Sequence, residues 1–247
     1  MNPVLVRSRV APSDGDRLML GVSRPKRTLA WASGIFAIAL GGFLLFYHSG
    51  RAAEPHVPVI VVFGDSFTAG LGLPHDEAFP AQLEAWLRAQ GKPARVVSAG
   101  KSGDTTEAAL SRLDKAIAEH PDVVILELGT NDALRGINPA TTQANLGTMI
   151  TKFREGGAKQ LLLTGILAPP NWGEEYRHAF DRVYPELARS YDVPLYPSFL
   201  DGVALDPQLN QPEGLHPNAR GVAIIVSRLG PVLVSLFLAE PAAAPPR

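Results

Sequence analysis

Four short polar segments of the chain carry the side chains best suited to chemistry. They are Gly64-Asp65-Ser66, 98–105, 129–132 and 213–217. A serine that follows an apolar run and a glycine can lie on a tight turn with its hydroxyl exposed. A free hydroxyl is a weak nucleophile and needs an adjacent base. The pattern indicates nucleophilic catalysis at Ser66, provided that another segment supplies the base.

His216 is the residue that best fits the role of that base. It stands in Glu213-Gly-Leu-His216-Pro, and imidazole changes its protonation near neutral pH. Glu213, three residues earlier, can turn back onto the second ring nitrogen and fix the tautomer. The three residues predict a Ser-His-Glu triad. A Ser–His dyad, with a backbone carbonyl or water orienting the ring, is the alternative.

Attack on an ester or thioester carbonyl creates an oxyanion that needs hydrogen-bond donors. We expect these from the backbone N–H groups of Ser66 and Gly103 and from the side-chain amide of Asn131. Loss of one such donor typically costs about 2.7–4 kcal/mol of transition-state stabilisation. Asp65 and Asp132 are expected to brace their turns rather than act on substrate.

Taken singly, each segment has a plainer explanation. Gly-Asp-Ser is a common turn, and Gly129-Thr-Asn-Asp132 could be a turn with a helix cap. Ser102-Gly-Asp-Thr105 could be a cap or an anion site at a helix start, and the segment around His216 could be a surface loop. Only their joint placement after strands favours catalysis.

Alternating apolar runs and amphipathic stretches predict the elements that position these segments. Strands are expected at 59–63, 95–99, 122–128, 160–164 and 193–195. Helices are expected at 79–90, from Thr105 or Thr106 to Pro121, at 140–154, at 174–190 with a kink or break at Pro185, and at 218–237. This alternation predicts an α/β fold, a three-layer α/β/α arrangement around a five-stranded parallel sheet. In such sheets sites lie beyond the carboxyl ends of the strands.

Near its N-terminus the chain has a long uncharged apolar run, 29–47, preceded by Arg24, Lys26 and Arg27. The run predicts one N-terminal hydrophobic helix, either a transmembrane anchor or the core of a signal peptide cut near 50–53 with Met19 as the start. A buried core helix is the remaining alternative. The segments expected around it are 1–28, as a cytoplasmic segment or the n-region of a signal peptide, a linker 48–57, a catalytic domain 58–238 and a flexible tail 239–247. The positive charge places the catalytic part in the periplasm or outside the cell.

Composition excludes some chemistry. The 247 residues have a net charge of −1 and contain no cysteine, which rules out disulfides and a cysteine nucleophile. The charge gives no reason to expect a nucleic-acid partner. We expect no metal, because four of the histidines lack paired ligand spacing: His56, His75, His120 and His178. We expect no organic cofactor either, since Gly70-Leu-Gly72 is too short for a dinucleotide fingerprint and acyl transfer to a serine needs none. The stripe Tyr176, Phe180 and Tyr184 is expected in the core or a pocket wall. Oligomeric state stays open.

The four segments resemble the conserved blocks of the SGNH (GDSL-type) hydrolase superfamily, in order and spacing. The resemblance runs from Val59 to Leu238 and is greatest to the bacterial thioesterase-I, lysophospholipase and arylesterase group. It implies the flavodoxin-like form of the α/β fold, Ser66 as nucleophile, Gly103 and Asn131 in the oxyanion hole and His216 as base. One departure is Glu213, where the family usually has aspartate.

The resemblance implies a serine esterase that hydrolyses small carboxylic esters or thioesters through an acyl-enzyme. Segments 134–139 and 166–172 resemble the edges of the family's acyl pocket, whose apolar residues here are Leu134, Ile137, Ile166, Leu167 and Trp172. Two alternatives are a carbohydrate O-acetylesterase acting on cell-envelope polysaccharide and a non-catalytic, membrane-tethered binding module.

Overall fold

A computed structural model of the chain describes residues 56–237. A parallel sheet runs through them in the order β2-β1-β3-β4-β5. Its strands are β1 (Val59–Gly64), β2 (Arg95–Gly100), β3 (Val123–Glu127), β4 (Gln160–Thr164) and β5 (Leu195–Tyr196). All of β3 and all but the first residue of β1 are buried, as expected of continuous apolar runs covered on both faces. The predicted five-stranded parallel sheet is confirmed.

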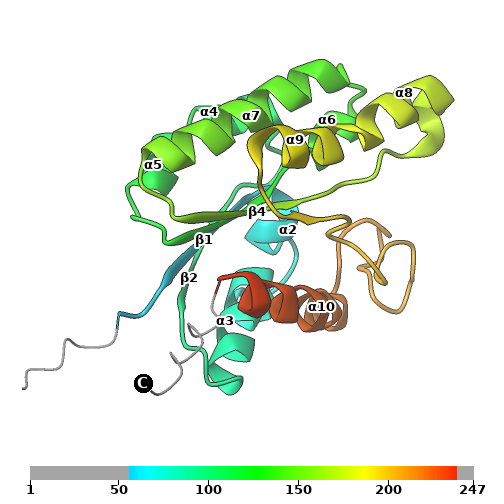
Figure 1. The fold of residues 1–247 in the computed structure, drawn as a ribbon. Helices are drawn as coiled ribbons and strands as arrows, with labels where there is room; N and C mark the ends of the chain where they lie inside the picture. Colours follow the sequence, from blue (N-terminus) through cyan, green and yellow to red (C-terminus); the bar gives the residue numbers. More distant parts are fainter. Residues whose placement is uncertain (1–55, 238–247) are drawn as a thin grey trace, which may run out of the picture. The chain divides into compact units, whose positions relative to one another are not determined.

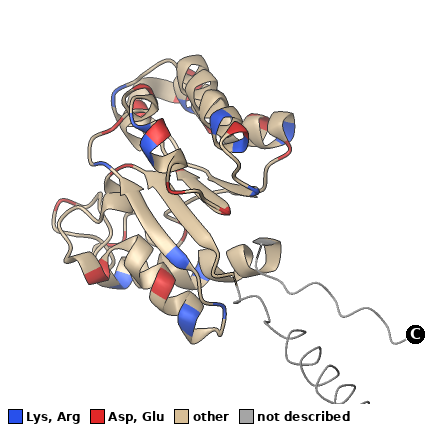
Figure 2. Cartoon of the chain, turned by 90° about the vertical axis from the view of Figure 1, so that its left-hand side faces the viewer, with Lys and Arg blue, Asp and Glu red and all other residues tan. Residues whose placement is uncertain are grey.

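Helices cover both faces of the sheet (Figure 1). One layer holds α2 (Ser66–Ala69), α3 (Phe79–Ala89) and α10 (Ala219–Phe237). The other holds α4 (Thr106–Leu110), α5 (Leu113–Ile117), α6 (Thr130–Leu134), α7 (Pro139–Glu155), α8 (Gly173–Asp181) and α9 (Val183–Tyr191). Two short 3₁₀ turns, His75–Glu77 and Pro170–Trp172, complete the elements. Acidic and basic residues are interspersed over both layers (Figure 2).

Helix α10 is long and apolar because it is a core helix. By length and composition it is the one helix among the described residues that would be able to cross a membrane. Val222, Ile225 and Leu229 on its inner face are nonetheless buried in the core. It packs so closely on α3 that a Cβ atom at Gly230 would lie 2.6 Å from the Trp86 ring.

Three predicted boundaries are wrong. The expected strand 193–195 is shifted to Leu195–Tyr196, because α9 ends in a left-handed cap at Asp192. The expected helix 174–190 does break, but at Arg182 rather than at Pro185. Pro185 falls in the first turn of α9, where its missing N–H costs nothing. The helix expected from 105 onward is divided at Ser111 and Arg112.

Several predicted segments lie outside the described residues. These are 1–28, the hydrophobic run 29–47, the linker up to residue 55 and the tail from residue 238.

The topology brings three of the polar segments together. Strands β2 and β3 flank β1 on opposite sides, so the chain order of the strands reverses there. Loops at such a switch point diverge and leave room for a ligand beyond the carboxyl ends of the strands. The segments around Ser66, Gly103 and Asn131 follow β1, β2 and β3 respectively.

Candidate active site

The turn that carries Ser66 forms at the end of β1. The Asp65 side chain caps α2 by accepting a hydrogen bond from Phe67 N at 3.1 Å, and Ser66 is the first residue of that helix. Gly64 has no room for a side chain, since a Cβ atom would lie 2.0 Å from Thr68 Oγ1 and 2.4 Å from Glu127 Oε2. The sequence Gly-Asp-Ser therefore builds a tight strand-to-helix turn with the serine at its tip.

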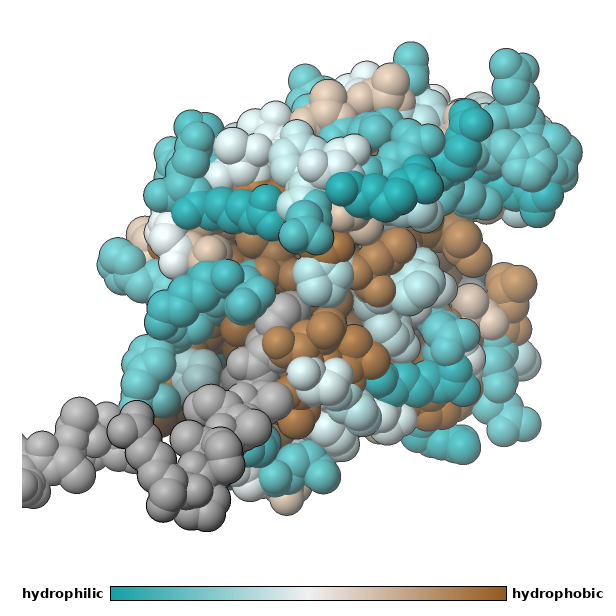
Figure 3. All heavy atoms as spheres, viewed as in Figure 1, coloured by the Kyte–Doolittle hydropathy of each residue, from teal (hydrophilic) through white to brown (hydrophobic). Residues whose placement is uncertain are grey.

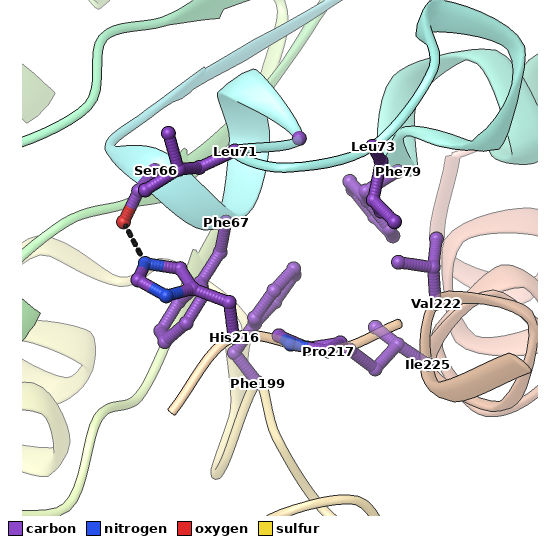
Figure 4. A pocket seen from close by; sticks show the side chains of 11 residues that line it. Ser66, Phe67, Leu71, Leu73, Phe79, Phe199, His216, Pro217, Val222 and Ile225 are labelled. Atoms are coloured by element: carbon purple, nitrogen blue, oxygen red, sulfur yellow. Dashed lines mark hydrogen bonds between the residues drawn. The ribbon is translucent and has the colours of Figure 1, made fainter. Parts of the chain in front are cut away.

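Ser66, His216 and Glu213 form a continuous hydrogen-bonded chain. Figure 4 shows its first link, between Ser66 and His216. His216 Nε2 lies 2.9 Å from Ser66 Oγ, and Nδ1 lies 2.9 Å from Glu213 Oε1. An ionised carboxylate only accepts, so Nδ1 carries the hydrogen and Nε2 is free to accept from the serine hydroxyl. Phe67 packs edge-on against the imidazole, with the ring centroids 5.6 Å apart. These contacts fix both the position and the tautomer of the ring.

Glu213 reaches the ring because the chain turns sharply between the two residues. Gly214 adopts a φ of +80° and donates to Gln211 O at 2.8 Å, while Gln211 N donates to His216 O at 2.7 Å. Glu213 Oε1 also accepts from His216 N at 3.0 Å. Hydrogen bonds from its own backbone N–H and then from His216 N lower the pKa of Glu213. The carboxylate, whose side chain is 48% exposed to water, is therefore ionised at neutral pH.

The three expected oxyanion donors follow adjacent strands. Ser66 lies in the first turn of α2, where backbone N–H groups have no intrahelical acceptor. Gly103 has a φ of +82°, with open space above it. Asn131 Nδ2 donates to Asp104 O at 3.0 Å and to Asp65 Oδ2 at 3.4 Å, which ties the amide to both neighbouring loops.

The two aspartates expected to brace turns do so. Asp65 caps α2 as described. Asp132 is fully buried and accepts from Thr106 N at 2.8 Å, from Thr106 Oγ1 at 2.6 Å and from Thr142 Oγ1 at 3.0 Å. It therefore joins α6 to α4 and α7.

A second buried carboxyl group lies beneath the nucleophile turn. Glu127, at the end of β3, is 0% exposed and accepts from Thr68 Oγ1 at 2.7 Å and from Asp65 N at 3.4 Å. Its Oε1 atom has no hydrogen-bond partner among the described residues. Burial, and then the charge of Asp65, raise the pKa of Glu127 well above its usual value, and burial raises the pKa of Asp65 to about 6. Glu127 therefore keeps its proton to a higher pH than an exposed glutamate does.

A largely apolar cavity of about 320 Å³ begins beside the nucleophile turn at Phe67 and Thr130. Of the five predicted pocket residues, it is lined by Leu134, Ile166 and Leu167. The remaining lining residues are Ala133, Gly165, Ala168, Pro169, Pro170, Ser198, Leu200, Ala204, Leu205 and Leu215. Figure 3 shows apolar surface on this side, over the loop between β5 and α10.

Ile137 and Trp172, the other two predicted pocket residues, do not line this cavity. Trp172 instead donates from Nε1 to Ala133 O at 2.8 Å and lies over Gly136. The Ile137 carbonyl accepts from the Tyr176 hydroxyl at 2.9 Å. Both residues support the segment after α6 from outside the cavity.

The remaining histidines and aromatic residues have ordinary surroundings. The described residues contain no group of three or more His, Asp or Glu side chains able to hold a metal ion. Phe180 and Tyr184 are buried in the core, as expected, and Tyr176 packs against Phe180.

The parallel α/β sheet, with a serine at the end of its first strand hydrogen-bonded in order to a histidine and a carboxylate, defines a serine hydrolase-type site. The chain belongs to the GDSL-like lipase/acylhydrolase family, whose profile matches residues 62–224.

Named relatives and a solved structure agree with this family. Esterase TesA of Pseudomonas aeruginosa is 42% identical over 179 residues, which cover 72% of this chain and 89% of that protein. Thioesterase 1/protease 1/lysophospholipase L1 of Escherichia coli K12 is 40% identical over 161 residues, 64% of this chain and 75% of that protein. The psychrotrophic esterase EstA from a Pseudoalteromonas species, solved inhibited by monoethylphosphonate, superposes with a TM-score of 0.70 at 28% identity, covering 74% of this chain and 100% of that one.

Sequence reasoning missed the support that Glu127 and Asp104 give to the site. The sequence did contain one indication that Glu127 is buried, because it is the single charged residue inside an otherwise apolar strand run. Asp104 left none, because a polar residue in a glycine-containing turn is explained equally well as solvated.

The buried Glu127 predicts an unusual dependence of stability on pH. The folded state holds the Glu127 proton more tightly than the unfolded state, so the free energy of unfolding should fall as pH rises above 4.5 towards the raised pKa. Glu127→Gln removes this titration. Urea unfolding between pH 5 and 8 should give a flatter profile for Glu127→Gln than for the unsubstituted protein. The half-exposed Glu119→Gln is the control, and equal slopes for all three proteins would contradict the prediction.

Proposed function

We propose that this chain is an esterase that transfers an apolar acyl group from a carboxylic ester or thioester to Ser66 and then to water. The observation that carries the proposal is the chain of 2.9 Å contacts from Ser66 through His216 to Glu213. Membership of the GDSL-like lipase/acylhydrolase family supports the same reaction class.

In the first half of the reaction, His216 Nε2 takes the proton of Ser66 Oγ as that oxygen bonds to the carbonyl carbon. The tetrahedral intermediate collapses, the bond to the leaving oxygen or sulfur breaks, and Nε2 returns the proton to the leaving group. In the second half, His216 deprotonates water, which attacks the acyl-enzyme and releases the acid and Ser66. Glu213 stabilises the imidazolium at each step. No step requires a cofactor.

The N–H groups of Ser66 and Gly103 and the amide of Asn131 donate to the oxyanion. Asn131 Nδ2 has two hydrogens, and its contact to Asp65 Oδ2 is the longer of its two, at 3.4 Å against 3.0 Å. A bond of that length is weak. We assign that hydrogen to the oxyanion, while the bond to Asp104 O holds the amide in place.

The largely apolar cavity of about 320 Å³ supports the proposal that the substrate carries an apolar acyl chain, which this cavity would bind. Leu134, Leu167 and Leu205 line it and are themselves exposed at its mouth. An acetyl group would leave such a cavity unfilled, so the site favours longer acyl esters over acetylated glycans.

The first 55 residues bear on where the reaction takes place. The apolar run 29–47 with basic residues before it supports export, with the enzyme either anchored in the inner membrane or released after cleavage. We therefore expect the esterase to act in the periplasm or outside the cell.

Labelling with a fluorophosphonate probe tests the nucleophile. The unsubstituted protein should be modified at Ser66, because an activated serine hydroxyl attacks phosphorus as it attacks a carbonyl. Ser66→Ala should abolish labelling and lower kcat about 10⁴–10⁶-fold. Mass spectrometry of the labelled peptide locates the adduct. Absence of labelling would contradict the esterase proposal and favour the non-catalytic binding module.

Substitution of the carboxylate tests the triad. Glu213→Gln keeps a hydrogen-bond acceptor but loses the charge that stabilises the imidazolium, so kcat should fall on the order of 10²–10⁴-fold. KM should change little, since Glu213 contacts the ring at Nδ1, while the serine lies at Nε2, and Glu213 does not line the cavity. Steady-state hydrolysis of p-nitrophenyl butyrate gives both constants, with the exposed Glu175→Gln as control. Near-normal kcat would leave a Ser–His dyad.

Chain-length preference tests the cavity. Across p-nitrophenyl acetate, butyrate, octanoate and palmitate, alongside acyl-CoA and acetylated glycan, we expect kcat/KM to be higher for octanoate than for acetate. Ala204→Trp would fill the cavity and lower the octanoate-to-acetate ratio of kcat/KM about tenfold. Ala89→Trp, at the exposed end of α3, is the matched control and should leave the ratio unchanged. Activity confined to acetylated glycan would favour the O-acetylesterase instead.

A further inference from the structure

Arg112 is a largely buried cation that the reaction described above does not use. It lies in the break between α4 and α5, and its side chain is 19% exposed. The guanidinium carbon lies 4.3 Å from the centroid of the buried Phe63 ring, beneath the end of β1. Burial of a charged group is costly unless the group is paired and hydrogen-bonded. Three hydrogen bonds, one of them within an ion pair to Asp104, offset this cost for Arg112.

Each of the three guanidinium nitrogens binds a different segment. Nε donates to Asp104 Oδ2 at 2.6 Å, Nη1 donates to Ala99 O at 2.5 Å, and Nη2 donates to Gly64 O at 2.7 Å. Ala99 and Gly64 lie at the ends of β2 and β1, and Asp104 lies in the loop after β2. One rigid planar group therefore joins two adjacent strand ends to a loop.

These three acceptors sit next to the proposed oxyanion donors. Gly64 O belongs to the peptide unit directly before the one that carries Ser66 N–H. Asp104 directly follows Gly103, and its backbone oxygen accepts from Asn131 Nδ2 at 3.0 Å. Each donor of the proposed oxyanion hole is thus connected to the Arg112 guanidinium through a residue that the guanidinium binds: Ser66 through Gly64, and Gly103 and Asn131 through Asp104.

We propose that Arg112 is a positioning residue that sets the spacing of the three oxyanion donors without touching substrate. The proposal rests on the assignment of Ser66, Gly103 and Asn131 in the proposed function. Lysine cannot substitute, because a single ammonium group does not reproduce the three-way fork. The fold does not depend on Arg112 alone, since Lys101 N also donates to Gly64 O at 3.1 Å and the β1–β2 ladder is complete.

A groove of about 260 Å³ opens beside Arg112 and gives water access to it. Lys101, Lys115 and Glu119 line the groove with Arg112, along the outer edge of β2. A small cation can therefore enter from this side in a variant that lacks the guanidinium. This makes chemical rescue a practical readout.

The test compares Arg112→Met and Arg112→Lys with Arg95→Met, whose guanidinium is half-exposed and bonds Glu119 away from the site. With p-nitrophenyl butyrate, kcat should fall about 10–100-fold in both Arg112 variants, as expected of a small misplacement of catalytic groups, while KM stays within about threefold. Arg95→Met should keep both constants. Guanidinium chloride at low millimolar concentration should restore part of the kcat of Arg112→Met, whereas ammonium chloride should not.

A second variant separates a loss of catalysis from a loss of stability. In Arg112→Met the buried Asp104 keeps only the exposed Lys101, at 3.7 Å, as a cationic partner. If this variant fails to fold, the double variant Arg112→Met/Asp104→Asn, which also removes the carboxylate charge, is measured instead, and the same fall in kcat is expected. A folded variant with unchanged kcat, or a loss in kcat that guanidinium does not relieve at all, overturns the proposal.

The rate of fluorophosphonate labelling separates this inference from the proposed function. Labelling of the unsubstituted protein at Ser66, with slower labelling of Arg112→Met, supports both. Normal labelling of both proteins overturns the role of Arg112 and leaves the esterase intact. Absence of labelling in the unsubstituted protein overturns the proposed function, and the role of Arg112 with it.

Discussion

The hydrogen bond between Ser66 and His216 joins two residues that are 150 positions apart in the chain. It connects the first strand of the described domain to the loop before its last helix. A contact of 2.9 Å over that separation requires both ends to be fixed independently. Most of the architecture serves this requirement, since β1 and α2 hold the serine while the loop 206–218 and α10 hold the histidine.

Different kinds of interaction hold the serine and the histidine in place. The serine end depends on burial, since Gly64 has no room for a side chain and the buried Glu127 accepts a hydrogen bond from Thr68 beneath the turn. The histidine end depends on a network of polar contacts at the surface. Asn218 caps α10 through bonds to Arg220 N and Gly221 N, and Gln211 Nε2 reaches back to Leu71 O at 2.7 Å. That last bond ties the loop directly to the segment that follows the nucleophile helix.

The strands and the polar segments of the site were predictable, because short local patterns in the sequence indicate both. Apolar runs marked all five strands, and glycine-containing polar segments after three of them marked the site. The shortest strand was misplaced because two residues carry too little pattern to compete with the cap at Asp192. Ile137 and Trp172 were misassigned because sequence shows that a residue is apolar, but not on which side of a loop its side chain packs. The contacts of Arg112 were out of reach, since an arginine between two leucines in a helical pattern looks the same whether it faces water or the sheet.

The loop that carries His216 has a consequence for when the site exists. The base His216, the carboxylate Glu213 and helix α10 come late in the described domain. The nucleophile Ser66 comes near its beginning. During synthesis, a partly emerged chain holds a serine with no base to activate it. The order of the sequence itself therefore delays the appearance of a reactive hydroxyl until α10 has docked and the domain is closed.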